Sequence, residues 1–275
     1  MNKVFQLVFY FILTIFSFSS WSKNSITWYE TNTPPVFILE GPFKGQGYIQ
    51  LILEQIIEGL TDYEHIFETA TAARILYNLK QEEKSCYPTL IKTKQREEFI
   101  AFSKPVELTP TLRLITRKGF IPDINQNESI DLLALINKNY SILLIKERSY
   151  GLFIDDILSQ LETGNIQRIV TAGNQTILKM LLKKRTDMAL AYPFEVNFFV
   201  NDLQMFEQLD LYSIKGLPQY QLGHVGCPKN AWGNKIIKQV DERIDEIKDT
   251  PEYIKAMTKW WPHEAERMKS MGYLN

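Results

Sequence analysis

The spacing of apolar residues predicts several helices that each bury one face. Between Tyr48 and Leu60 the apolar residues recur every three or four positions, as on a helix that packs against a sheet. The same spacing predicts a long helix over Trp232–Ile247, and Pro251 stands where the first turn of a further helix begins. Shorter helices are expected at Ala72–Leu79, Ile130–Ile136, Leu152–Leu161 and Gln175–Lys184, with Ser129 as the N-cap of the second.

Short apolar runs between these helices predict strands. They cover Ile26–Tyr29, Ser85–Leu90, Leu112–Thr116, Tyr140–Ile145, Ile166–Val170, Met188–Tyr192 and Tyr220–Gly226. Strands that alternate with helices of this length form mostly parallel sheets joined by crossover helices. Two successive sets of such elements predict an α/β protein with two lobes.

The N-terminus is typical of an export signal. Lys3 precedes the almost wholly apolar segment Val4–Phe18, and its roughly 15 residues are short for a membrane span but usual for a signal peptide. Ser20 and Ser22 fit the small-residue cleavage rule, so we expect residues 1–22 to be removed. An uncleaved anchor helix is the alternative, because Trp21 is an awkward neighbour for the peptidase.

Composition and motifs argue against several classes of function, namely nucleic-acid binding, metal binding and enzymatic catalysis. The chain has 275 residues, 45% hydrophobic and 23% charged, and its net charge of −1 offers no basic excess for a nucleic-acid partner. Two cysteines and the histidines His65, His224 and His263 show no metal-ligand spacing. The sequence has no nucleophile elbow, phosphate-binding loop or zinc-protease motif, so we expect neither an enzyme nor a bound cofactor or metal.

One stretch carries candidate chemistry, Thr93–Pro105, with the sequence TKQREEFIAFSKP. It places Arg96 just after the strand expected to end near Leu90. Ligands of open α/β sheets collect at the carboxyl ends of strands, and a guanidinium there can bind a carboxylate or phosphate through two parallel hydrogen bonds. The alternative is a surface ion pair of Arg96 with Glu97 or Glu98.

The stretch resembles the T-x-x-R-x-x-x-x-x-F-S-x-P signature of the family 3 extracellular solute-binding proteins, the periplasmic amino-acid-binding type. Ile26–Phe37 (ITWYETNTPPVF) and Leu112–Gly119 (LRLITRKG) resemble further segments of that family at matching separations. The resemblance implies a two-lobed type II periplasmic-binding-protein fold, in which a two-strand hinge joins lobes with mostly parallel sheets. Residues 23–113 and 216–275 would form lobe one, and residues 114–215 would form lobe two.

The resemblance also implies ligand contacts in lobe one. Arg96 matches the arginine that binds the α-carboxylate of the ligand, and Thr89 matches a hydroxyl contact. Glu30 falls where the family often has a residue facing the ligand side chain. Arg74 is a second positive group near the start of its helix. In lobe two, Ser149 and Tyr150 precede a helix whose free backbone amides are a candidate anion site.

The departures from the family pattern put an α-amino-acid ligand in doubt. Tyr192 stands where an aspartate usually holds the α-ammonium group, and Glu195 is a possible replacement from a shifted position. Gln50 replaces an aspartate, and Ile91 replaces a hydroxyl contact. A carboxylate with an aromatic or polar body, in contact with Tyr150, Tyr192 and Phe194, fits equally well. Packing on the hinge side is the alternative role for these aromatic residues.

The same resemblance makes Cys86 and Cys227 neighbours on antiparallel strands of lobe one. A disulfide between them is expected in an oxidising compartment, and two buried free thiols are the alternative.

Taken together, the sequence predicts a monomeric periplasmic binding protein that captures a small polar or anionic solute by hinge closure, for uptake by an ABC-type permease. A sensing module that delivers its closed form to a membrane partner is an alternative. A dehydratase-like enzyme on the same fold, with Glu30 or Glu195 as the general acid, is another.

Overall fold

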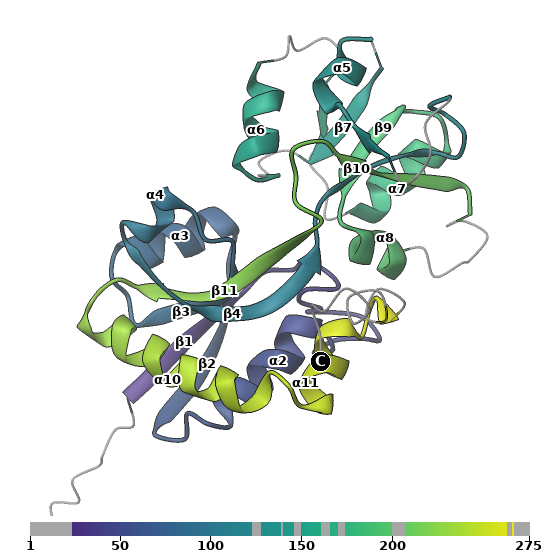
Figure 1. Ribbon diagram of the computed structural model, residues 1–275. Coiled ribbons are helices and arrows are strands. Elements are labelled where there is room, and N and C mark those ends of the chain that lie inside the picture. Colours follow the sequence, from purple (N-terminus) through teal and green to yellow (C-terminus); the bar gives the residue numbers. More distant parts are fainter. Residues whose placement is uncertain are drawn as a thin grey trace, which may run out of the picture.

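The computed structural model forms two lobes, each built on its own sheet (Figure 1). It describes residues 24–122, 128–138, 140–145, 150–160, 166–169, 174–199, 207–262 and 266. The expected signal peptide and Ser149 lie outside these ranges. Within them, no helix has the length and apolar character needed to cross a membrane.

The first lobe contains a mixed five-stranded sheet. Its strands, in spatial order, are β2 (Tyr63–Thr69), β1 (Asn24–Glu30), β3 (Ser85–Leu90), β11 (Tyr220–Pro228) and β4 (Ile100–Pro110). The β2, β1 and β3 strands are parallel, and β11 is antiparallel to both of its neighbours. The helices of this lobe are α2 (Tyr48–Ile57), α3 (Ala72–Lys80), α4 (Lys94–Glu97), α10 (Ala231–Ile247) and α11 (Pro251–Thr258). Apolar residues of α2, α10 and α11 form one core with the sheet, and those of α3 form another.

The second lobe contains a mixed six-stranded sheet. Its strands, in spatial order, are β6 (Ser129–Ile130), β10 (Leu209–Ile214), β5 (Arg113–Arg117), β9 (Met188–Ala191), β7 (Ile142–Ile145) and β8 (Ile166–Ile169). The helices are α5 (Leu132–Ile136), α6 (Leu152–Ser159), α7 (Asn174–Leu182) and α8 (Pro193–Phe199). Residues of α5 and α6 pack into one core and residues of α7 into another.

The chain passes between the two sheets twice, and the two crossings lie side by side. The first lies between the end of β4 and the start of β5, and the second between the end of β10 and the start of β11. Thr111 joins them, because its amide donates to the Gln219 carbonyl at 3.1 Å and its hydroxyl donates to the Pro218 carbonyl at 2.5 Å. The expected two-strand connection between the lobes is therefore present.

Some elements differ from the sequence expectation. Ser129 does not cap a helix: it lies with Ile130 in β6, which pairs with β10, and the side chain of Asp131 caps α5 by accepting from the Ala134 amide at 3.0 Å. Burial of Ile130 beside β10 favours the extended conformation. The spacing of apolar residues also did not predict β2, β10, α8 and most of β4, because polar residues interrupt the apolar positions of these elements.

A disulfide joins Cys86 on β3 to Cys227 on β11. The two strands are antiparallel neighbours in lobe one, so the expected pairing is confirmed and the free-thiol alternative is wrong. The bond ties the returning strand to the lobe across a sequence separation of 141 residues.

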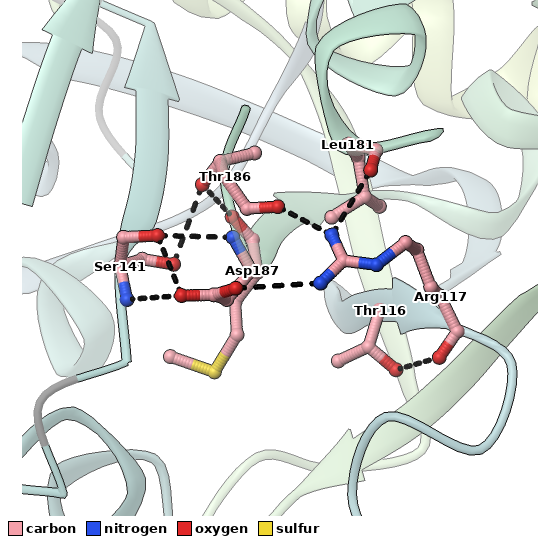
Figure 2. A network of polar contacts seen from close by, with 7 residues as sticks. Thr116, Arg117, Ser141, Leu181, Thr186 and Asp187 are labelled. Carbon is pink, nitrogen blue, oxygen red and sulfur yellow. Dashed lines mark hydrogen bonds and ion pairs between the residues drawn. The ribbon is translucent and has the colours of Figure 1, made fainter. Parts of the chain in front are cut away.

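A polar network stabilises the second lobe where β7 and β9 begin (Figure 2). The Arg117 guanidinium donates to the Thr186 carbonyl at 2.6 Å and forms an ion pair with Asp187 at 3.3 Å. The other oxygen of Asp187 accepts from the Ser141 amide at 3.0 Å and from its hydroxyl at 2.8 Å. Burial alone would raise the pKa of Asp187, but the contacts with Ser141 and Arg117 together lower it.

Replacing Cys86 and Cys227 together by alanine is expected to lower the free energy of unfolding by about 2–5 kcal/mol, because the cross-link restricts a long loop of the unfolded chain. Urea unfolding of the mature chain measures the change. Wild-type protein unfolded in dithiothreitol should match the double variant. An unchanged midpoint in both samples would show that the bond contributes nothing to stability.

Asp187→Asn is expected to lower the free energy of unfolding by about 1–2 kcal/mol, a modest loss because the carboxylate is partly exposed. The folded pKa of Asp187 is lowered, so its contribution is complete above the unfolded value, about 3.9, and is lost as the pH falls through the folded value. Unfolding curves between pH 7 and pH 3 should therefore converge for wild type and variant. The exposed Asp62→Asn is the control, and curves that stay parallel would contradict the assignment.

Candidate ligand-binding site

The candidate site lies at the carboxyl ends of β1 and β3 in the first lobe. Glu30 ends β1, and Thr89 lies one residue before the end of β3. The short helix α4 follows, and its N-cap Thr93 accepts a hydrogen bond from the Arg96 amide at 3.3 Å. This local turn carries Arg96 back toward the end of the strand, where its Nη1 donates to the Ile91 carbonyl at 2.8 Å.

Arg96 is a half-buried cation without a carboxylate partner in the described part of the chain. Glu97, the partner that an ordinary surface arrangement would supply, instead forms an ion pair with Lys92 at 3.0 Å. Burial lowers the pKa of Arg96, and the nearby Tyr87 acts in the opposite direction. The guanidinium therefore keeps donors that an anionic group can use.

Glu107, a buried carboxylate on β4, was not predicted from the sequence. It is 7% exposed, and the hydroxyls of Thr89 and Tyr48 donate to it. Its side chain lies over Gly223 on β11, where an added Cβ would come within 2.0 Å of Oε1. Burial raises the pKa of Glu107 and the two hydrogen bonds oppose this, while Oε2 has no partner. The available signal was a single acidic residue within the segment Val106–Pro110 (VELTP).

Tyr87 interacts electrostatically with the charged groups of the site. Its hydroxyl is 3.1 Å from that of Thr31. Burial raises its pKa to about 12; Thr31 and Arg96 lower it, and Glu107 and Glu30 raise it. Tyr87 is therefore a neutral hydroxyl at physiological pH that shares an electrostatic environment with both carboxylates and with Arg96.

Glu30 is held in place by Gln50. The Gln50 amide nitrogen donates to Glu30 Oε1 at 2.8 Å, and its oxygen accepts from the amides of Ile38 and Gly47, each at 3.0 Å. Gln50, noted above as a replacement for an aspartate, thus orients Glu30 and also closes the first turn of α2.

The predicted second positive group, Arg74, is exposed on α3.

Two of the predicted residues of lobe two, Tyr150 and Glu195, make contacts within that lobe. Tyr150 is 4% exposed, and its hydroxyl accepts from the Ile145 amide at 2.8 Å. Glu195 is also 4% exposed, and its carboxylate accepts from the Tyr192 amide at 2.9 Å, which closes the first turn of α8.

Aromatic side chains connect the two lobes. Phe194 on α8 is 3% exposed and belongs to the core of lobe one, where its ring centroid lies 5.8 Å from that of Tyr48 and 5.1 Å from that of Trp261. Tyr192 stacks on Phe194 at 5.1 Å. We call these four residues the aromatic bridge. Figure 1 shows α8 facing α11, the helix that precedes Trp261. The structure therefore places Tyr192 and Phe194 in packing between the lobes.

Comparison with known proteins identifies the fold. No family profile and no curated protein match the chain by sequence. A histidine kinase sensor domain similar to periplasmic binding proteins superposes with a TM-score of 0.64 at 13% identity, over 87% of this chain and 96% of that one. A putative L-cystine ABC transporter protein from Listeria monocytogenes has a TM-score of 0.64 at 20% identity, over 88% and 97%.

A periplasmic binding protein of Salmonella typhimurium with high arginine specificity has a TM-score of 0.63 at 14% identity, over 87% of this chain and 100% of that one. The expected two-lobed periplasmic-binding-protein fold is therefore confirmed. At these identities the comparison establishes the fold, and function has to be argued from the residues of this chain.

Phe194→Ala is expected to lower the free energy of unfolding by about 3–5 kcal/mol and to separate the lobes, because it removes the central ring of the aromatic bridge. Chemical unfolding measures the first effect, and small-angle X-ray scattering of the folded variant measures the second. Phe199→Ala is the control, since Phe199 packs on the core of lobe two. Equal radii of gyration for the two variants would contradict a role in lobe placement.

Proposed function

We propose that this chain is a solute-binding protein that captures a small anionic or amino-acid-like solute between its two lobes. The observation that carries the proposal is Arg96: a half-buried guanidinium at the carboxyl ends of the strands, with no ion pair among the described residues. Because the guanidinium is partly desolvated and has no carboxylate partner, an anionic ligand that supplies this partner gains a charge-assisted hydrogen bond.

The remaining contacts follow from the positions of the predicted residues. The hydroxyl of Thr89, which donates to Glu107, keeps lone pairs for a ligand donor. Glu30 is oriented by Gln50 and offers a carboxylate to a cationic or hydroxyl group of the ligand. We assign Arg74 a supporting positive charge, and Ser149 and the helix start after it an anion contact from lobe two. Tyr150 fixes the segment that leads to that helix start by accepting from the Ile145 amide, and we keep Tyr192 and Glu195 at the start of α8 as candidate ligand contacts from lobe two.

Ligand binding is coupled to closure of the two lobes about the hinge. We place lobe one at residues 23–113 and 216–275 and lobe two at residues 114–215, with the two crossings as the hinge. A ligand held by Arg96 gains contacts with lobe two only when the lobes close, so it shifts an equilibrium between open and closed forms. The mechanism requires no covalent step, and we assign the chain no enzymatic activity.

We place the protein in the periplasm as a monomer, after cleavage of residues 1–22. The N-terminal apolar segment and the Cys86–Cys227 disulfide support an oxidising, exported location. The partner in uptake would be an ABC-type permease. The similarity to a histidine kinase sensor domain supports a second role, in which the closed form acts on a membrane sensor. Both roles begin with the same capture step.

Thermal unfolding of the mature chain should reveal capture. A ligand at 100 times its dissociation constant stabilises the folded protein by about 2.7 kcal/mol, which raises the melting temperature by several degrees. We expect such a rise with one class among amino acids, dicarboxylates, small peptides and aromatic acids. Arg96→Ala should abolish it, because the ligand carboxylate loses its partner.

Arg168→Ala is the matched control, since Arg168 is exposed on the edge strand β8 of the other lobe. It should retain the full rise. If no compound shifts the wild-type curve, or if Arg96→Ala keeps the shift, solute capture at this site is wrong.

A further inference from the structure

Large apolar side chains are exposed on both lobes, near the candidate site on lobe one and at the start of α6 on lobe two. On lobe one these are Ile91, 39% exposed, and Leu222, 45% exposed. On lobe two they are Leu152, 66% exposed, and Phe153, 44% exposed. We call these four residues the apolar lips. They make up half of the eight large hydrophobic residues that are exposed in the described ranges.

On lobe one, the lips lie next to the candidate anion site. Ile91 directly follows β3, and its carbonyl accepts the hydrogen bond from Arg96 at 2.8 Å. Leu222 lies on β11, two residues before His224, which pairs with Leu90 at the end of β3. Both side chains are therefore close to the end of the strand that positions Arg96.

On lobe two, one of the lips lies against the second crossing. Leu152 and Phe153 are the first two residues of α6. The Phe153 ring covers Gly216 in the second crossing: an added Cβ there would lie 2.5 Å from Cζ of Phe153, and Gly216 has a φ of +93°. Figure 1 shows α6 on the side of lobe two that faces α3 and α4 of lobe one. Rotation of the lobes toward each other about the crossings brings the two pairs closer.

We infer that the solute carries an apolar body, a branched aliphatic chain or an aromatic ring, beside the anionic group that binds Arg96. Ile91 is exposed beside the Arg96 guanidinium, and its side chain, without donors or acceptors, cannot hydrogen-bond a polar ligand body there. Closure over an apolar body removes the lips from water, which favours the closed form in proportion to the apolar area buried. The inference rests on the proposed function and specifies its substrate class.

Titration calorimetry with carboxylates of increasing apolar size tests the inference. The probes are acetate, butyrate, 3-methylbutyrate and phenylacetate, and in parallel glycine, alanine, leucine and phenylalanine. We expect affinity to rise about fourfold for each buried methylene group in at least one series. Ile91→Ser should weaken binding of the largest ligand about tenfold and change binding of the smallest much less.

Ile66→Ser is the matched control, because Ile66 on β2 is also 39% exposed but lies at the far edge of the lobe-one sheet. It should leave every affinity unchanged. Affinities that depend on Arg96 but not on apolar size, or an Ile91→Ser variant that binds the largest ligand like wild type, would overturn the inference and keep the proposed function. Absence of binding to every carboxylate, with or without an apolar body, would overturn both.

Discussion

Burial of Phe194 in the core of the opposite lobe is the contact on which the arrangement of this protein depends. Its ring packs between Tyr48 and Trp261 of lobe one and stacks on Tyr192, which also packs against the core of lobe two. Because closely packed aromatic rings resist continuous deformation, relative motion of the lobes has to preserve this contact or exchange it for another packed state. Together with the two crossings, the aromatic bridge would limit the proposed closure to a rotation.

The second constraint is electrostatic and lies within lobe one. Glu107 is buried and Arg96 is half-buried, and both share an environment with Tyr87. Glu107 is tolerated because Thr89 and Tyr48 donate to it and because Gly223 leaves room for its side chain. Arg96 has no such compensation from a carboxylate among the described residues. This asymmetry makes the arginine end of the site, and not the glutamate end, the natural place for a ligand of opposite charge.

Much of the fold was predictable from local patterns. The apolar stripes of α2 and α10 and the apolar runs of β1, β3 and β9 were found because each element buries one face or lies wholly inside a core. Edge strand β2 was missed because it is mostly exposed and its polar residues hide the strand pattern. The cap of α5 was assigned to Ser129 and not to Asp131, because pairing of Ile130 with β10 is a long-range effect that no local pattern contains.

In the candidate site, too, some features follow from local sequence and others depend on the tertiary structure. The sequence by itself determined the position of Arg96, because the strand end, the Thr93 cap and the following turn are all formed by neighbouring residues. Only the tertiary structure decided that Glu107 borders the site, that Phe194 is buried in the other lobe and that Phe153 packs on Gly216 in the second crossing. Each of these contacts joins segments far apart in the chain, so it depends on strand register and lobe packing, which a single sequence does not encode in any local spacing.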